Sequence, residues 1–358
     1  MTAAPRVDVL VPFGEAPAHP ERTQNLIRVL TDLCATLDYP NYRVSLVEIS
    51  ARPSQQRLAD ELGAGYVFAR RDGEFSPGRA MNLGVVERSR PAELIYFHQT
   101  DFLVGPDVLS RAVDQLQRLD CPFVFPYWGE IHLSAPVSTA IRRAELDPVD
   151  LLARFRRLVG SWRTETPPAQ GPQATGHDEV VLTSGEYEYV TRSFPSTLKK
   201  TLHEAAQVDL WGVDDRPYAP YRWTPSTDRG AEVCRISRGP RASAAYLCTD
   251  QAFRRAGGVP ELPGWGFEDL MFWQLIQAFH PYAADRAAIS YDGTAVTLGD
   301  PLLHLWHPVS GSSGYYAATA ENQKAFNHLA ALDATQIRQQ ATPLPDAPPQ
   351  PRHEGSAP

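Results

Sequence analysis

The chain has 358 residues, of which 43% are hydrophobic and 21% are charged, a balance typical of a globular protein with a sizeable core. A net charge of -8 gives no general attraction to nucleic acid or to anionic membranes, but it leaves room for a local basic site that binds a phosphorylated ligand. The four cysteines are widely spaced without a Cys-x-x-Cys pair, so they indicate reduced packing residues and neither disulfides nor a zinc site. The N-terminus has no basic, apolar leader, and no apolar run reaches the roughly 18 residues of a spanning helix. We therefore expect a cytoplasmic protein without a membrane span.

The first part of the chain alternates between short apolar runs and stretches with helical periodicity. Strands are expected over residues 7–13, 43–49, 65–69, 93–97 and 123–127, and helices over residues 25–33, 55–62, 78–88 and 108–119. Strands that alternate with helices predict an α/β sheet with helices on both faces, and ligands of such sheets bind outside the carboxyl ends of the strands. Phe13, Glu48 and Asp101 fall at such ends.

The pattern loosens after residue 128. Residues 129–242 are interpreted as an insertion of helices and aromatic loops that covers one edge of the site, with helices over 148–158 and 196–207. Regularity returns with a strand over 244–248 and helices over 250–256 and 318–332. Residues 333–358 are proline-rich towards their end and are expected to form a disordered tail.

One stretch of the second half combines features of an active site. Gly264 and Gly266 allow the backbone to turn and to approach a ligand closely, while Trp265 between them offers a flat face for a sugar ring. Glu268 and Asp269 follow in the first turn of an expected helix, where the helix dipole favours ionised carboxylates. The alternative is that the acids cap a buried helix and the tryptophan belongs to the core.

A second group of residues is suited to a divalent cation. The chain has no Gly-x-Gly-x-x-Gly after the first strand and no P-loop, so a bound nucleotide would need another means of neutralising its diphosphate. A metal ion is the common alternative, and Asp101, His304 and His307 are the candidate ligands. Residues three apart share a face in a turn or a helix but not in a straight strand, and Pro308 favours a turn. The alternative is that one of the two histidines is structural.

Four groups of segments, in this order, carry a family resemblance: 9–13 (VLVPF) with 21–26 (ERTQNL), 79–84 (RAMNLG) with 95–101 (IYFHQTD), 253–261 (FRRAGGVPE) with 264–269 (GWGFED), and 304–307 (HLWH). They resemble the inverting GT-A glycosyltransferases of family 2. In the second half they also resemble the galactosyltransferase C-terminal region of the β-1,4-galactosyltransferases and chondroitin-polymerase-like enzymes. The resemblance covers roughly residues 6–128 and 243–328, and its most specific element is Gly-Trp-Gly-x-Glu-Asp.

The resemblance implies a Rossmann-like GT-A fold, with a mixed, mostly parallel sheet flanked by helices. Residues 1–128 would be the nucleotide-sugar-binding half and residues 243–332 the acceptor and catalytic half. The insertion over 129–242, mostly helices and loops, would lie on the acceptor side or act as a lid.

The implied reaction is the inverting transfer of a sugar from a nucleotide sugar, expected to be a UDP-sugar, to a hydroxyl of a soluble acceptor. The acceptor would be a small polyhydroxylated metabolite or a glycan. Asp269 would be the general base, Glu268 would position the acceptor or cap the helix, and Trp265 with Gly266 would contact the sugars. Mn²⁺ or Mg²⁺ would be held by Asp101, His307 and also His304. The implied donor-binding residues are Pro12, Phe13, Arg22, Glu48, Arg79, Asn82, Gln99 and Asp101.

The sequence departs from the family pattern at Gln99, where an aspartate is usual. Glutamine can hydrogen-bond a ribose hydroxyl but is a poorer ligand for a hard cation, which weakens the expectation of a metal without removing it. Simpler roles also remain open: Phe13 in the core, Arg22 on a solvated helix face, and Asn82 as a structural hydrogen-bonder.

Two other functions are compatible with parts of the sequence. A non-catalytic carbohydrate-binding relative could keep Trp265, whereas a sugar-nucleotide pyrophosphorylase should have a glycine-rich, arginine-bearing loop after the first strand, which this chain lacks.

Overall fold

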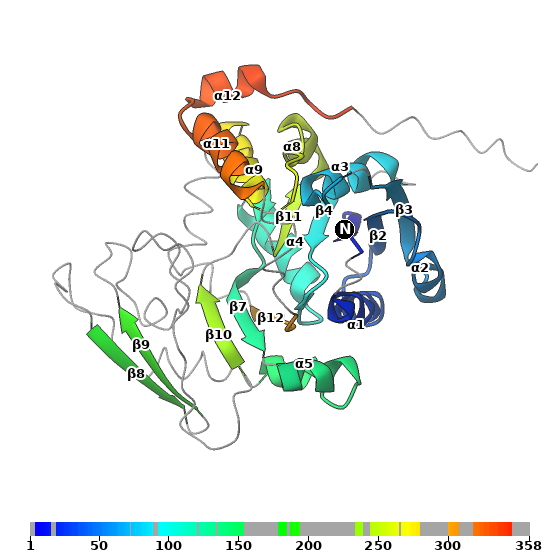
Figure 1. Ribbon diagram of the computed structural model, residues 1–358, viewed down its shortest axis with the longest axis vertical. Coiled ribbons are helices and arrows are strands. Elements are labelled where there is room, and N and C mark those ends of the chain that lie inside the picture. Colours follow the sequence, from blue (N-terminus) through cyan, green and yellow to red (C-terminus); the bar gives the residue numbers. More distant parts are fainter. Residues whose placement is uncertain are drawn as a thin grey trace, which may run out of the picture.

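The computed structural model describes residues 4–15, 19–71, 73–88, 92–119, 122–133, 135–153, 178–184, 187–193, 233–238, 244–264, 266–279, 300–307 and 318–345. A sheet with strand order β3-β2-β1-β4-β11-β6 forms its centre (Figure 1). Its strands are β1 (Val7–Phe13), β2 (Tyr42–Ser50), β3 (Gly65–Arg70), β4 (Leu94–His98), β6 (Phe123–Val124) and β11 (Ala245–Thr249). The first four are parallel to one another, and β11 runs antiparallel to both β4 and β6.

Helices cover both faces of this sheet. They are α1 (Pro20–Thr36), α2 (Gln56–Leu62), α3 (Pro77–Glu87), α4 (Val108–Leu119), α8 (Asp250–Arg255) and α9 (Glu268–Phe279). The helix α3 packs on β1 and β2, and α1 lies on the opposite side of these strands (Figure 1). The expected α/β fold, a mixed and mostly parallel sheet flanked by helices, is confirmed.

The centre of the sheet is buried on both faces. Every residue of β1 is buried, as expected for a strand inside a helix-covered parallel sheet. An aromatic cluster then fixes α9 against β4 and β11: the Tyr246 ring lies 4.8 Å from Phe97, 5.0 Å from Phe123 and 5.5 Å from Phe272, measured between centroids. Because Phe272 belongs to the first half of α9, this packing also fixes the position of the acids that begin the helix.

A second sheet, of order β10-β7-β12-β5, lies beside the first. Its strands are β5 (Phe102–Leu103), β7 (Tyr127–Leu133), β10 (Val233–Arg238) and β12 (Asp300–His304), and a separate hairpin consists of β8 (Asp178–Ser184) and β9 (Tyr187–Ser193). Between β7 and the hairpin, α5 (Ala135–Arg142) is followed by a helical stretch over 148–153.

The insertion over residues 129–242 was expected to consist mostly of helices and loops. This expectation is wrong for the described residues of that range, because they include the whole of the strands β8, β9 and β10. The helix expected over 196–207 lies outside the described residues.

The C-terminal region differs from the expected disordered tail. After α11 (Thr319–Ala330), the helix α12 (Ala334–Gln340) begins with a capping box: Asp333 Oδ1 accepts from the amides of Thr335 and Gln336, and the Gln336 side chain accepts from the Asp333 amide. Ile337 is buried against α9, and the Leu344 amide donates to the Arg254 carbonyl at 3.0 Å. Capping and a few well-placed apolar side chains thus order residues 333–345, and residues 346–358 lie outside the described ranges. In the described parts of the chain, no helix combines the length and hydropathy needed to span a bilayer.

Candidate active site and metal centre

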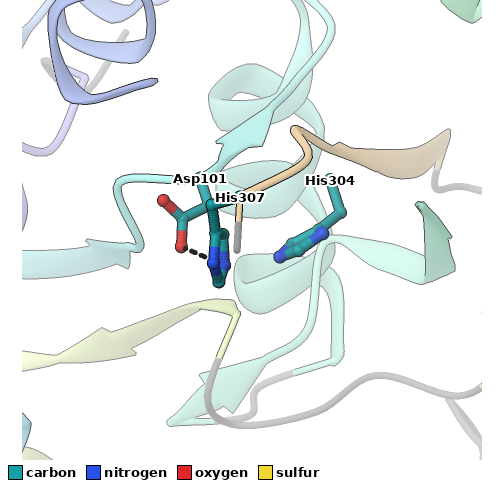
Figure 2. Close-up of side chains that lie close together, drawn as sticks. All are labelled: Asp101, His304 and His307. Carbon is teal, nitrogen blue, oxygen red and sulfur yellow. Dashed lines mark ion pairs between the residues drawn. The ribbon is translucent and has the colours of Figure 1, made fainter. Parts of the chain in front are cut away.

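Asp101, His304 and His307 lie together at the junction of the two sheets (Figure 2). Asp101 lies between β4 and β5, and His304 is the last residue of β12, where it pairs with Phe102 of β5. The Leu305 amide donates to the Asp101 carbonyl at 2.7 Å. One ligand atom from each of the three side chains lies within 4.8 Å of the others. The strand ends at His304, so the chain can turn and bring His307 back to the same side.

Asp101 and His307 are largely shielded from solvent and lie close enough to form an ion pair. His307 Nε2 lies 3.2 Å from Asp101 Oδ2, and the two side chains are 13% and 14% exposed. Burial by itself would raise the pKa of the Asp101 carboxyl, but His307, with smaller effects of His304 and Arg22, holds that pKa well below its usual range. The cluster therefore offers an ionised carboxylate and two imidazoles, a donor set that fits a divalent cation.

The segment that carries the two histidines is clamped by α1 and α5. Asn25, fully buried in α1, donates to the carbonyls of Leu305 and Trp306 at 3.5 and 3.4 Å. Arg142 Nη1 donates to Asn25 Oδ1 at 2.9 Å and to the Trp306 carbonyl at 3.2 Å, and the Trp306 amide donates to Ser138 Oγ at 2.8 Å. We name Asn25, Ser138 and Arg142 the clamp. Sequence reasoning missed it, although a polar residue at an apolar position of the α1 pattern was a signal for Asn25.

A third histidine joins the cluster from β7. His132 is the register partner of His304 in the parallel pair β7–β12, and their Nδ1 atoms lie 3.1 Å apart. The ring centroids of these two residues are 4.5 Å apart, and Phe102 packs on His304 at 4.8 Å. His132 was missed because its segment was interpreted as part of the insertion.

The predicted donor residues of β1 and β2 are largely buried in the fold. Pro12 is buried and Phe13 is 2% exposed. Glu48 is 0% exposed, and its carboxylate accepts from the Ser54 hydroxyl at 2.6 Å, from the Tyr66 hydroxyl at 2.6 Å and from the amides of Ser54 and Gln55. Burial would raise the pKa of Glu48, but these hydrogen bonds lower it overall. Glu48 therefore holds the turn between β2 and α2.

Two of the predicted donor residues, Arg79 and Asn82, belong to α3. Asn82 is 6% exposed and exchanges two hydrogen bonds of 2.9 Å with the backbone of Val259, and it donates to Glu261 Oε1 at 3.1 Å. These bonds join α3 to the segment that leads into residues 264–269. Arg79 is half-buried in the first turn of α3. Gln99 follows β4 and is half-buried, and its backbone amide donates to the Ala244 carbonyl at 3.1 Å.

The turn before α9 has an unusual backbone. Gly264 and Gly266 have φ angles of 67° and 107°, which glycine adopts readily, and the bulky Phe267 also has a positive φ of 73°. The Gly264 amide donates to the Phe75 carbonyl at 3.0 Å, and the Phe267 ring stacks on Phe326 of α11 at 5.4 Å. Trp265 lies outside the described residues. Strained residues of this kind persist where the surrounding packing holds them, and they cluster at functional sites.

The two acids that begin α9 have different environments. Glu268 is 6% exposed, and its Oε2 has no hydrogen-bond partner among the described residues. Burial, together with the neighbouring Asp269, raises the pKa of Glu268 to about 8, against the opposing effect of the amides of Gly266 and of Glu268 itself. Asp269 is half-buried, and its Oδ1 accepts from the Leu270 amide at 2.8 Å. At pH 7 Glu268 is therefore mostly protonated and can donate a hydrogen bond.

The ring of Tyr246, from β11, packs on both β4 and the first half of α9. Burial raises the pKa of Tyr246 well above its ordinary value, and the charges of Asp269 and Glu268 add to this. Tyr246 pairs with Phe97, one residue before the carboxyl end of β4, and Asp101 follows that same end. The first half of α9, through the packing of Phe272 on Tyr246, and Asp101 thus both adjoin the last residues of β4.

No family model matches the chain, and no curated protein matches it in sequence. Among solved structures, glucosyl-3-phosphoglycerate synthase from Mycobacterium tuberculosis in complex with Mn²⁺, UDP and glucosyl-3-phosphoglycerate matches with 12% identity. That match covers 94% of this chain and 81% of the synthase, with a TM-score of 0.37. Residues 1–349 of S. aureus TarS match with 10% identity over 93% of this chain and 68% of that chain, with a TM-score of 0.38. In the complex of TarS 1–349 with UDP-GlcNAc, the match is 13% identical and covers 36% of this chain and 34% of that chain, with a TM-score of 0.27. Likenesses this distant assign no activity to the chain.

Proposed function

We propose that this chain is an inverting glycosyltransferase that moves a sugar from a nucleotide sugar, a UDP-sugar, to a hydroxyl of a soluble acceptor. The observation that carries the proposal is the Asp101, His304 and His307 cluster at the carboxyl end of β4, where ligands of α/β sheets bind. The acids that begin α9, whose charges act on Tyr246 beside β4, would supply the second requirement, a base for the acceptor. The acceptor class is a small polyhydroxylated metabolite or a glycan.

The cluster would hold a divalent cation. Of the two expected cations, Mn²⁺ accepts imidazole ligands more readily than Mg²⁺, which prefers an all-oxygen environment, so Mn²⁺ fits this donor set better than Mg²⁺. When bound, the cation supplies positive charge for the diphosphate that leaves. Arg22, whose charge acts on Asp101, and Arg79 at the start of α3 would add to that charge. Gln99 would contact the ribose, while Pro12, Phe13, Glu48 and Asn82 would shape the donor side.

The chemistry is a single displacement. The acceptor oxygen forms a bond to the anomeric carbon, the bond from that carbon to the diphosphate oxygen breaks, and the diphosphate leaves with the electron pair. Asp269 takes the proton of the acceptor hydroxyl, a contribution typically worth about 10²- to 10⁴-fold. Glu268, neutral at pH 7, would donate a hydrogen bond that positions the acceptor, with Trp265 and Gly266 against the sugars. Attack from the face opposite the leaving group inverts the anomeric centre.

The decisive variant is Asp269→Asn. It should fold and bind donor as the wild type does, because the amide is isosteric, but it should lose transfer by about 10²-fold or more because it cannot accept the proton. Donor binding is measured by thermal shift, and transfer by product formation. Glu321→Gln is the matched control: it also changes an acid in the first turn of a helix, but its side chain is 73% exposed in α11. Near-normal turnover of Asp269→Asn would remove Asp269 as the base.

A panel of nucleotide sugars with and without Mn²⁺ tests the donor class. A ligand that binds only the folded state raises the melting temperature in proportion to its binding, so a UDP-sugar with Mn²⁺ should give the largest shift. Slow release of sugar to water would separate an enzyme from a carbohydrate-binding relative, which should release none. Activity unchanged after exhaustive EDTA treatment would remove the metal from the proposal.

A further inference from the structure

The contact between His132 and His304 restricts where the protons of both rings can lie. Their Nδ1 atoms are 3.1 Å apart, a hydrogen-bond distance, and such a bond between two neutral imidazoles needs one proton between the two nitrogens. Each neutral ring carries one proton in total, so the ring that donates from Nδ1 has a bare Nε2, and the ring that accepts at Nδ1 carries its proton on Nε2.

The orientation of His304 decides which arrangement suits a cation. In Figure 2 the tip of the His304 ring, far from its Cβ, points towards His307 and Asp101. A metal ligand must present a lone pair, so binding at this tip requires a bare Nε2 and a proton on Nδ1. His132 must then accept at its Nδ1 and keep its own proton on Nε2.

The fold holds this contact in place. His132 and His304 are register partners in neighbouring parallel strands, so their side chains project from the same face of the second sheet. The Phe102 ring packs on the His304 ring, with their centroids 4.8 Å apart, and this packing limits rotation of the His304 ring. Both histidines are partly buried, so the surrounding side chains restrict their rotamers and hold the pair together.

We propose that His132 is a positioning residue that accepts a hydrogen bond from His304 Nδ1 and thereby keeps His304 Nε2 bare and aimed at the cation site. Its consequence for catalysis rests on the metal site of the proposed function, but the hydrogen bond itself does not. Partners of this kind that orient a ligating histidine typically contribute 10- to 100-fold in metal affinity.

The first test needs no metal. In the metal-free full chain labelled with ¹⁵N-histidine, the imidazole nitrogen shifts report which nitrogen of a neutral ring carries the proton. We expect His304 as the Nδ1–H form and His132 as the Nε2–H form, with His304→Asn and His132→Asn used for assignment. His304 as the Nε2–H form would overturn the proposal.

The second test measures Mn²⁺ affinity from the EPR signal of the free ion. His132→Phe keeps a ring of similar size but removes the acceptor, and should weaken binding about 10- to 100-fold. His132→Asn places an oxygen near the position of Nδ1 and should restore affinity to within a few fold. The control is His328→Asn, a change at an exposed histidine of α11 that should leave affinity unchanged.

The outcomes separate the two proposals. Wild-type affinity in His132→Phe, or equal weakness in His132→Phe and His132→Asn, would overturn the role of His132. If His132→Phe does not fold, the nitrogen shifts of the wild type and the affinity of His132→Asn still decide. If the wild type binds no Mn²⁺, the metal site of the proposed function fails, while the nitrogen shifts still decide the role of His132.

Discussion

The buried carboxyl of Glu268 should make the stability of the fold depend on pH. Its side chain is 6% exposed, and its Oε2 has no hydrogen-bond partner in the described parts of the chain, so ionisation in place costs free energy that the unfolded chain does not pay. Glu268→Gln keeps the shape and removes the charge. The comparison of this variant with the wild type isolates that one carboxyl.

The raised pKa of Glu268 makes the fold less stable as the pH rises. Because the pKa of Glu268 is raised from 4.5 to about 8 in the folded protein, its contribution to stability is fully present below pH 4.5 and is lost as the pH rises through 8. The whole change corresponds to on the order of 5 kcal/mol, of which about 3 kcal/mol falls between pH 5.5 and 8.5. Glutamine has no proton to lose, so the variant gains stability over the wild type by that amount as the pH rises.

The assay is urea unfolding of both proteins at pH 5.5, 7 and 8.5, with circular dichroism as the signal. Glu145→Gln, at a carboxylate that is 61% exposed, is the control and should follow the wild type at every pH. Glutamine can also donate a hydrogen bond, so the variant should retain transfer at pH 7. A constant difference between Glu268→Gln and the wild type across the pH range would refute the reasoning.

Three further substitutions test the packing around the site. Asn82→Ala should lower the free energy of unfolding by about 2 kcal/mol in urea, because it leaves the buried amide of Val259 without its acceptor; an unchanged midpoint would contradict this. Gly78→Ala should destabilise by about 1–3 kcal/mol, since the new Cβ would clash with the Pro260 carbonyl oxygen; the stabilisation usual for alanine in a helix would show that the contact relaxes freely. Asn25→Ala should cost about 2 kcal/mol and also weaken Mn²⁺ binding, because it loosens the segment that carries the two histidines; unchanged Mn²⁺ affinity in the EPR assay would argue against the clamp.

The N-terminal half of the fold could be predicted because its signals are local. Residues 7–13 are a continuous apolar run, and residues 108–119 show one apolar helical stripe; both lie where the structure has β1 and α4. The second sheet could not be found in this way. Its strand β5 has two residues, and β12 pairs with strands that are far away in the sequence, so no window of the chain contains its pattern.

The candidate site shows the same division. Asp101, His304 and His307 were grouped from residue type and order, and the structure brings them together. His132 and the clamp act through tertiary contacts of single residues in unremarkable segments, so the sequence held little to single them out. The different environments of Glu268 and Asp269 likewise come from burial, which adjacent positions in a sequence do not reveal.

The pairing of β5 with β12 has a consequence for folding. The cluster forms only when residues near 101 meet residues near 304, which closes a loop of roughly two hundred residues and fixes it through two residue pairs between these strands. Long loops of this kind close late, because their entropy is lost before the contacts compensate. The site should therefore be among the last parts of the molecule to form and the first to open. A cation bound by residues of both segments would stabilise the contact between them.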